Sequence, residues 1–209
     1  MSNLLDDLRA SLRNPDHWVY ASWLDNVTHY RRTYLGILWA LVPTVLYIWG
    51  IGGFLGGMQP GSMQAYLGHV GVGFVVFRLI MVVFSDATSV FASYRSYIYD
   101  GNVRLTDFIL RSVNRSLIYF VLVFPLLAIA ALGSPEFVIS GVPASLLGMF
   151  ALVLNLFVYS VLLSLLGARF PDLSELMGSL MMAAFLLTPI MWDPASAPEG
   201  TVRGLLMRA

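Results

Sequence analysis

Lysine and cysteine are both absent from this sequence, and each absence excludes a group of reactions. All 12 basic residues are arginines, so there is no lysine with which a P-loop could reach the phosphates of ATP. Schiff-base chemistry through a lysine side chain is excluded for the same reason. Without cysteine there is no disulfide, no thiolate nucleophile and no thiolate metal ligand. Any ATP hydrolysis that drives this protein is therefore expected on another chain.

Charge of either sign is also scarce. Charged residues make up 11% of the sequence and hydrophobic residues 58%, whereas soluble domains carry roughly 25% charged residues. Residues 33–77 and 137–168 contain no Asp, Glu, Lys or Arg. Each stretch exceeds the roughly 20 apolar residues that a helix needs to cross a bilayer. The first 18 residues include acidic side chains and no apolar run, which excludes a signal peptide there. The sequence predicts an all-α, polytopic membrane protein.

Five apolar segments are long enough to cross the membrane. The expected spans cover about residues 35–54, 66–84, 116–132, 142–167 and 175–191. The second span could continue as a helix to Ser93, and the most charged connection follows it at residues 94–115. Turn-forming residues separate the spans at 59–62 and 133–136. Glycines at the end of the first span form two small-xxx-small pairs, which could accommodate a close helix neighbour.

The placement of arginine predicts the orientation of these spans. The N-terminal segment and the connections 94–115 and 168–174 contain arginine, while the connections after the first and third spans contain none. Because arginine is enriched on the cytoplasmic side, we expect the N-terminus and those two connections to be cytoplasmic. The tail after the fifth span would then lie outside, although it carries Arg203 and Arg208.

Residues 1–32 are expected to form a cytoplasmic segment that precedes the membrane domain of residues 33–209. Within it, residues 14–30 are rich in Trp and Tyr, whose rings favour the headgroup zone of a bilayer. This pattern predicts an amphipathic helix along the membrane surface, with Asn14 as its N-cap and Pro15 at its first position. A water-exposed amphipathic helix is the alternative.

Arg78 is the most unusual residue of the spans. It lies about 12 residues into the second span, roughly 18 Å along the helix at 1.5 Å per residue. An unpaired arginine at that depth costs at least about 2.5 kcal/mol. It either lines a polar pathway that meets an anionic substrate, or bonds backbone carbonyls of another helix or snorkels to the interface. Asp86 lies two turns further along, too far for a direct bond.

The remaining polar residues predict packing rather than catalysis. Asn155 is expected to hydrogen-bond a neighbouring helix. The three histidines lack the i, i+4 spacing of metal ligands, so no metal site is expected. No nucleophile elbow and no paired carboxylates occur in the spans. The aromatic residues either pack and anchor the helices in lipid, or present flat faces on which sugar rings stack.

Three regions of the sequence resemble the ABC-2 type permease family, in its polysaccharide export branch. The first is HYRRTYLGILWALVPTVLYI at residues 29–48, and the second comprises YLGHVGVGFVVF at 66–77 with LRSVNRSLIYF at 110–120. The third is LLGARFPDLSELMGSLMMAAFLLTPIMWDP at 165–194, with its A-R-F-x-D turn and T-P-I-x-W ending. The resemblance covers about residues 14–209. Arg78 departs from it, because relatives tend to carry bulky apolar residues at that position.

The resemblance implies a half-transporter. Two permease copies would form the pathway and two separate ABC ATPase subunits would drive it, so no cofactor is expected in this chain and ATP would bind the partner. The family has six spans, and this sequence ends after an outer re-entrant segment, so we expect the last span to be missing. ATPase-coupling candidates follow the second span: Arg95, Tyr97, Asp100, Arg104 and Asp107. The resemblance implies substrate-pathway candidates from the first and fifth spans: Tyr47, Trp49, Phe185 and Trp192. Arg78 is a further candidate because of its charge within the second span, and the resemblance gives it no role.

The resemblance leads to a permease subunit that exports a lipid-linked polysaccharide, such as O-antigen or capsule, across the bacterial inner membrane. Its expected partners are the ATPase, a second permease copy, the lipid-linked polysaccharide and membrane lipids, with no nucleic acid and no enzymatic activity of its own. Two alternatives stay open. One is a membrane-embedded transferase acting on lipid-linked sugars, and the other is a truncated remnant that does not transport.

Overall fold

The computed structural model describes residues 4–58, 62–99 and 104–191, and every regular element in these ranges is a helix. The elements in chain order are α1 (Leu4–Arg13), α2 (Asp16–Tyr30), η1 (Gly36–Ala40), α3 (Val42–Val45), η2 (Leu46–Ile51), α4 (Gly52–Gly56), α5 (Met63–Ser93), α6 (Arg95–Tyr99), α7 (Leu105–Leu132), η3 (Ile139–Gly141), α8 (Val142–Arg169) and α9 (Leu173–Leu187). Within the described residues, four helical stretches are long and apolar enough to cross a membrane: Gly36–Gly56, Met63–Ser93, Leu105–Leu132 and Ile139–Arg169. The prediction of an all-α, polytopic membrane protein is confirmed.

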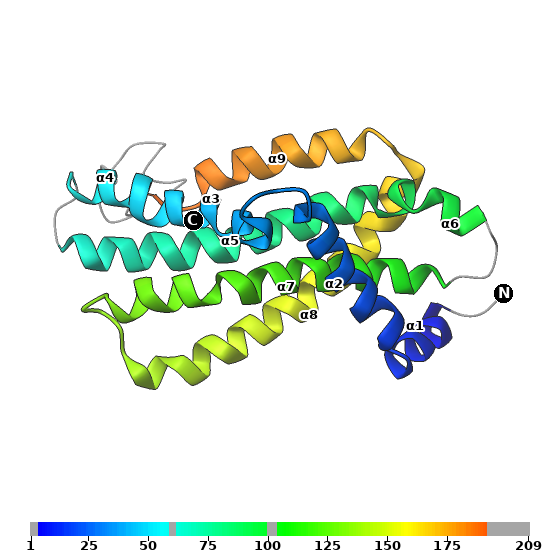
Figure 1. Ribbon diagram of the computed structural model, residues 1–209, viewed down its shortest axis with the longest axis horizontal. Helices are drawn as coiled ribbons and strands as arrows, with labels where there is room; N and C mark the ends of the chain where they lie inside the picture. The colour runs from blue at the N-terminus through cyan, green and yellow to red at the C-terminus, as the bar shows by residue number, and fades with distance from the viewer. Residues whose placement is uncertain (1–3, 59–61, 100–103, 192–209) are drawn as a thin grey trace, which may run out of the picture.

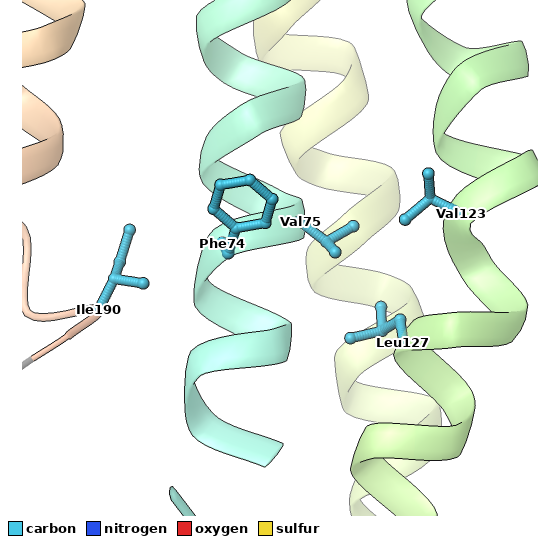
Figure 2. Close-up of a cluster of buried hydrophobic side chains, with 5 residues drawn as sticks. All are labelled: Phe74, Val75, Val123, Leu127 and Ile190. Carbon is cyan, nitrogen blue, oxygen red and sulfur yellow. The ribbon is translucent and has the colours of Figure 1, made fainter. Parts of the chain in front are cut away.

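Helix α5 forms the centre of the bundle. It contacts α4, α7, α8 and α9, and it lies between α9 and α7 in Figure 1. Phe74 and Val75 of α5 pack with Val123 and Leu127 of α7, and Ile190 closes the cluster from the segment after α9 (Figure 2). Helix α8 covers the other side of α5 and exposes large apolar side chains, as expected of a helix that faces lipid.

Helix α7 begins eleven residues before the expected third span, at Leu105 instead of Ser116. The charged stretch 94–115 therefore contributes the first turns of this helix, and only α6 and residues near it remain as a connection. The reason is that this stretch has an apolar helical face as well as charged residues. Phe108, Ile109 and Val113 belong to that face and are buried in the bundle. The predicted extension of the second span to Ser93 is confirmed.

The fifth expected span, residues 175–191, is only partly helical. Helix α9 has 15 residues and ends before Thr188, whose ψ of 134° is extended. Pro189 follows, and a proline disfavours helical backbone at the residue before it. Residues 188–191 then run along α5, where the Tyr66 hydroxyl donates to the carbonyl of Met191 at 2.7 Å. By length, α9 falls short of the four membrane-spanning helices. The predicted outer re-entrant segment lies outside the described residues.

The first span is irregular rather than a uniform helix. It passes from the 3-10 turn η1 through α3 to the π-helical turn η2 and then α4. Gly36 enters it with a φ of 54°, a left-handed conformation that glycine adopts without strain. The predicted glycine contact exists within this chain, since Gly52 approaches Leu67 and Gly56 approaches Tyr66 of α5.

Two smaller expectations are wrong. The N-cap position of α2 is Pro15 rather than Asn14, and no side chain caps that helix. Asn155 is exposed and donates to the carbonyl of Ala151 in its own helix, and it makes no bond to a neighbouring helix within the described part of the chain. A backbone carbonyl four residues back is available to any helical side chain that points away from the bundle.

Candidate functional site

An ion pair fastens α2 across the bundle to α7. The Arg111 guanidinium donates from Nε and Nη2 to the two carboxylate oxygens of Asp25, at 2.7 and 2.6 Å. Both side chains are 23% exposed. Such a bidentate pair fixes geometry better than a single contact. The pair joins residues 86 positions apart in the sequence, so it sets the position of α2 relative to the membrane helices.

Tyr94, just beyond the end of α5, completes this contact. Its hydroxyl donates to Asp25 Oδ2 at 3.2 Å, and the Arg111 guanidinium lies 4.8 Å from the centre of its ring. Burial raises the pKa of Tyr94, an effect that Arg111 opposes and Asp25 adds to. The hydroxyl therefore remains a hydrogen-bond donor, and α2, α5 and α7 converge on one carboxylate.

A second set of polar contacts runs beside the first. Arg115 of α7 forms an ion pair with Asp86 of α5. Asn26 of α2 donates to the backbone carbonyl of Arg115 at 3.1 Å. Asn114 donates to the Ser22 hydroxyl at 2.6 Å. These contacts hold the polar half of α7 against α2 and α5, where the sequence predicted a charged connection at residues 94–115.

A cavity of about 270 Å³ opens between α2, α5 and α7. The ion-paired carboxylates of Asp25 and Asp86 lie on its wall, together with the Arg115 guanidinium. Polar and charged side chains from all three helices line it, and the most informative are Asp25, His29, Arg78, Asp86, Arg115 and Tyr119. The structure thus gathers charges that are distant in sequence into one polar space inside an otherwise apolar bundle.

Arg78 lines this cavity without an ion pair or hydrogen bond to any residue that the structure describes, and its Nε is buried. Its guanidinium lies 4.9 Å from the centre of the Tyr119 ring and 6.0 Å from that of Phe74. One alternative is that Arg78 bonds backbone carbonyls of another helix. No such bond exists among the described residues. Asp86 pairs with Arg115 and makes no bond to Arg78 among the described residues, as expected from the distance between the two along α5.

The aromatic pathway candidates are only partly brought together. Tyr47 of η2 stacks on Phe74 with ring centres 4.0 Å apart, and meets the Phe185 ring edge-on at 5.7 Å. Phe74 in turn lies beside the Arg78 guanidinium. Trp49 is half-buried and makes no ring contact in the described part of the chain. Trp192 lies outside the described residues.

Two of the coupling candidates, Arg95 and Tyr97, belong to α6, which follows α5 at one end of the bundle (Figure 1). Arg95 donates to the Tyr99 hydroxyl within α6, and Tyr97 is exposed. Arg104 is exposed at the N-cap position of α7, and Asp107 lies in the first turn of that helix. Asp100 lies outside the described residues. These side chains form an exposed surface rather than a pocket.

Sequence reasoning missed the ion pairs of Asp25 and Asp86. One signal was available: Arg104, Arg111 and Arg115 are spaced seven and four residues apart, which is the period of one helix face. That spacing indicates that the arginines belong to a helix. The partner of each arginine is not encoded locally and required the packing of α2 and α5 against α7.

Comparison with known proteins gives no assignment. No family model matches the sequence, and no curated protein gives a significant match. Among the described residues, no group of three or more His, Asp or Glu side chains is placed to hold a metal ion. The function is therefore argued from the geometry of this chain and from the motifs in its sequence.

Proposed function

We propose that this protein is the permease subunit of an ABC exporter that moves a lipid-linked polysaccharide, such as O-antigen or capsule, across the bacterial inner membrane. The observation that carries the proposal is the attachment of α2 to α7 by Asp25 and Arg111, beside the exposed helix α6. An exporter subunit of this type needs a rigid cytoplasmic surface on which a separate ATPase can act. The polysaccharide class itself comes from the motifs at residues 29–48 and 165–194.

The arrangement of α1, α2 and α6 supports transmission of force from such a surface. All three lie toward the same end of the bundle (Figure 1). The Ser11 hydroxyl of α1 hydrogen-bonds that of Thr106 in α7 at 2.8 Å, and both side chains are buried. A partner that pushes on α6 or on the start of α7 would move α2 with them, because these contacts resist separation. Rigid-body movement of packed helices is a common route of such transitions.

The aromatic cluster supports a substrate that slides. Tyr47 and Phe185 are partly buried where η2, α5 and the end of α9 meet, and Tyr47 stacks one ring face on the buried Phe74. Sugar rings stack on such faces through their apolar C–H surfaces, without a deep pocket. A polymer that must pass through repeatedly would require weak, repeated contacts of this kind. The π-helical turn that carries Tyr47 belongs to a class of irregularity frequent at functional sites.

The partners follow from the same proposal. ATP would be hydrolysed on a separate subunit, since this sequence has no lysine for a P-loop. A second copy of the permease would complete the pathway. The large apolar side chains that α8 exposes, such as Leu147 and Phe150, would then contact membrane lipids or that second copy.

The test is co-purification from native membranes with a tag on the N-terminus, with bound proteins identified by mass spectrometry. We expect a P-loop ATPase in near-equal amount. The double variant Tyr97→Ala, Arg104→Ala should lose it while still inserting, because it removes two exposed side chains near α6. Glu136→Ala, on the connection between α7 and α8, is the matched control and should retain the ATPase.

Two outcomes would contradict different parts of the proposal. Stable insertion without any ATPase would contradict the exporter and favour the non-transporting remnant. Capture of an ATPase, with no change in surface polysaccharide when the gene is deleted, would contradict the proposed substrate class alone.

A membrane-embedded transferase on lipid-linked sugars is the second candidate. The observation in its favour is that Asp25, Asp86 and His29 line one cavity, and carboxylates and histidine are the usual general acids and bases. Against it, each carboxylate is already held by a guanidinium. Sugar transfer by the purified chain that is lost in Asp86→Asn would favour the transferase over the exporter.

A further inference from the structure

We infer that the cavity between α2, α5 and α7 binds a phosphate or diphosphate group, with Arg78 as its principal ligand. The proposal rests on the unmatched charge of Arg78 among the described residues, on the burial of its Nε atom and on the position of the cavity along α5. It does not rest on the exporter proposal, because the binding needs no partner subunit.

The first step is the charge balance of the cavity wall. The Asp25 carboxylate is neutralised by Arg111 and the Asp86 carboxylate by Arg115. Among the described residues, this leaves Arg78 as the arginine of the cavity without a counter-charge. With Arg111 counted, although it does not line the cavity, the two ion pairs and Arg78 together carry one excess positive charge, which attracts an anion.

The second step is the environment of that charge. The Nε atom of Arg78 is buried without a partner, and electrostatic attraction is stronger at a buried site than in water. The Tyr119 ring, 4.9 Å from the guanidinium centre, offers only a cation–π contact. An anion is the partner that such a group lacks. The planar fork of arginine matches phosphate oxygens in a bidentate manner.

Neighbouring groups supply further hydrogen-bond donors. His29 and Ser116 line the same cavity, as does Tyr119. The imidazole N–H and the Tyr119 hydroxyl can donate to the remaining phosphate oxygens, whereas the Ser116 hydroxyl already donates to the carbonyl of Ser112 at 3.3 Å. The volume of about 270 Å³ lies below the roughly 300–1,000 Å³ of pockets for drug-sized ligands. It suits a headgroup rather than a whole glycolipid.

The third step is depth. Arg78 is the middle residue of the 31-residue α5. The half before it carries no acidic or basic side chain except His69, while Asp86 and the contacts to α2 lie in the half after it. A hydrocarbon core of about 30 Å spans roughly 20 residues of helix. Because α5 has 31 residues, its charged end extends beyond such a core, and the wall residues Val82 and Asp86 place the cavity toward this end.

A phosphate in this cavity could belong to a lipid headgroup or to a soluble ion, and the experiment distinguishes the two. The full chain is placed in nanodiscs of phosphatidylcholine, and binding of ³²P-labelled probes is measured against empty nanodiscs. Farnesyl diphosphate serves as the membrane-anchored probe and inorganic diphosphate as the soluble one. Binding of farnesyl diphosphate alone supports a lipid source, and binding of both supports a site that accepts the free ion.

Three variants test the role of Arg78. Arg78→Gln should weaken binding about tenfold or more, since a hydrogen bond to a charged group is lost. Arg78→Lys keeps the charge and should retain part of the affinity. Arg95→Gln makes the same charge change on the exposed helix α6 and should leave binding unchanged.

A fourth variant keeps the test decisive even if Arg78→Gln does not fold. Val82→Phe fills the cavity while keeping Arg78, and it should abolish binding even if Arg78→Gln fails to fold. The proposal is overturned if neither probe binds above the level of empty nanodiscs. It is also overturned if Arg78→Gln or Val82→Phe, folded as judged by size-exclusion chromatography, binds as tightly as the wild type.

Discussion

The carboxylate of Asp25 in α2 accepts two hydrogen bonds from the guanidinium of Arg111 in α7, at 2.6 and 2.7 Å. This contact determines the position of α2 relative to the membrane helices. It attaches the aromatic-rich helix α2, which is predicted to lie along the membrane surface, to the helix bundle. The same contact makes the charged stretch before the third span part of a helix, with its arginine turned toward α2.

The Asp25–Arg111 pair should be strongly coupled in stability. Asp25→Asn and Arg111→Gln should each destabilise the protein by about 2 kcal/mol, because a charged hydrogen-bonding partner is left unmatched. The double variant should be destabilised by less than the sum, as expected for residues in direct contact. Thermal unfolding in detergent, followed by loss of the monodisperse peak, provides the measurement. Strictly additive effects would show that the pair does not hold α2 in place.

Gly167 should tolerate no side chain. A Cβ at this position of α8 would overlap the backbone carbonyl of Thr88 in α5, and the backbone has little freedom to yield. Gly167→Ala should therefore lower stability by about 1–3 kcal/mol or more, as overpacking does. Gly148→Ala, in the same helix, is the control because nothing lies within 4 Å of its Cβ. Equal melting temperatures for the two variants would contradict this close approach of α5 and α8.

The Tyr94 hydroxyl should make stability depend on alkaline pH. Burial raises the pKa of Tyr94 above its ordinary value of 10.0. The folded state therefore keeps a proton that the unfolded state releases, and the contribution of the hydroxyl is complete below pH 10.0. That contribution is lost as the pH rises through the raised pKa.

The measurement compares melting temperatures of the wild type and Tyr94→Phe from about pH 9 to about pH 12. The wild type should be more stable at the lower end, and the difference should shrink as the pH rises. A constant difference across the range would show that the hydroxyl does not titrate between the two states.

The orientation predicted from the arginines can be tested directly, because the chain contains no native cysteine. Ser96→Cys places a thiol on α6, and Glu136→Cys places one on the opposite connection between α7 and α8. A membrane-impermeant maleimide should label Glu136→Cys in intact spheroplasts and Ser96→Cys only after lysis. The reverse pattern would invert the topology and remove the surface proposed for the ATPase.

The sequence by itself determined that this protein lies in a lipid bilayer. It also determined much of the secondary structure. Long stretches without charge can be stable only in lipid, and this fixed the all-α, polytopic class. Local chemistry placed several boundaries as well. The helix after residue 62 runs to Ser93 as predicted, α7 ends before the expected turn at Gly133, and Pro189 ends α9 through its effect on Thr188.

Only the tertiary structure decided which charges meet. Asp25 and Arg111 are 86 residues apart, and no local pattern pairs them, since each could equally have faced water or a lipid headgroup. Packing of α2 and α5 against α7 paired Asp25 and Asp86 with arginines and left Arg78 without a counter-charge among the residues that the structure describes. The same packing brought Gly167 against the backbone of Thr88. A sequence specifies where a charge sits along a helix, but its partner depends on how the helices come together.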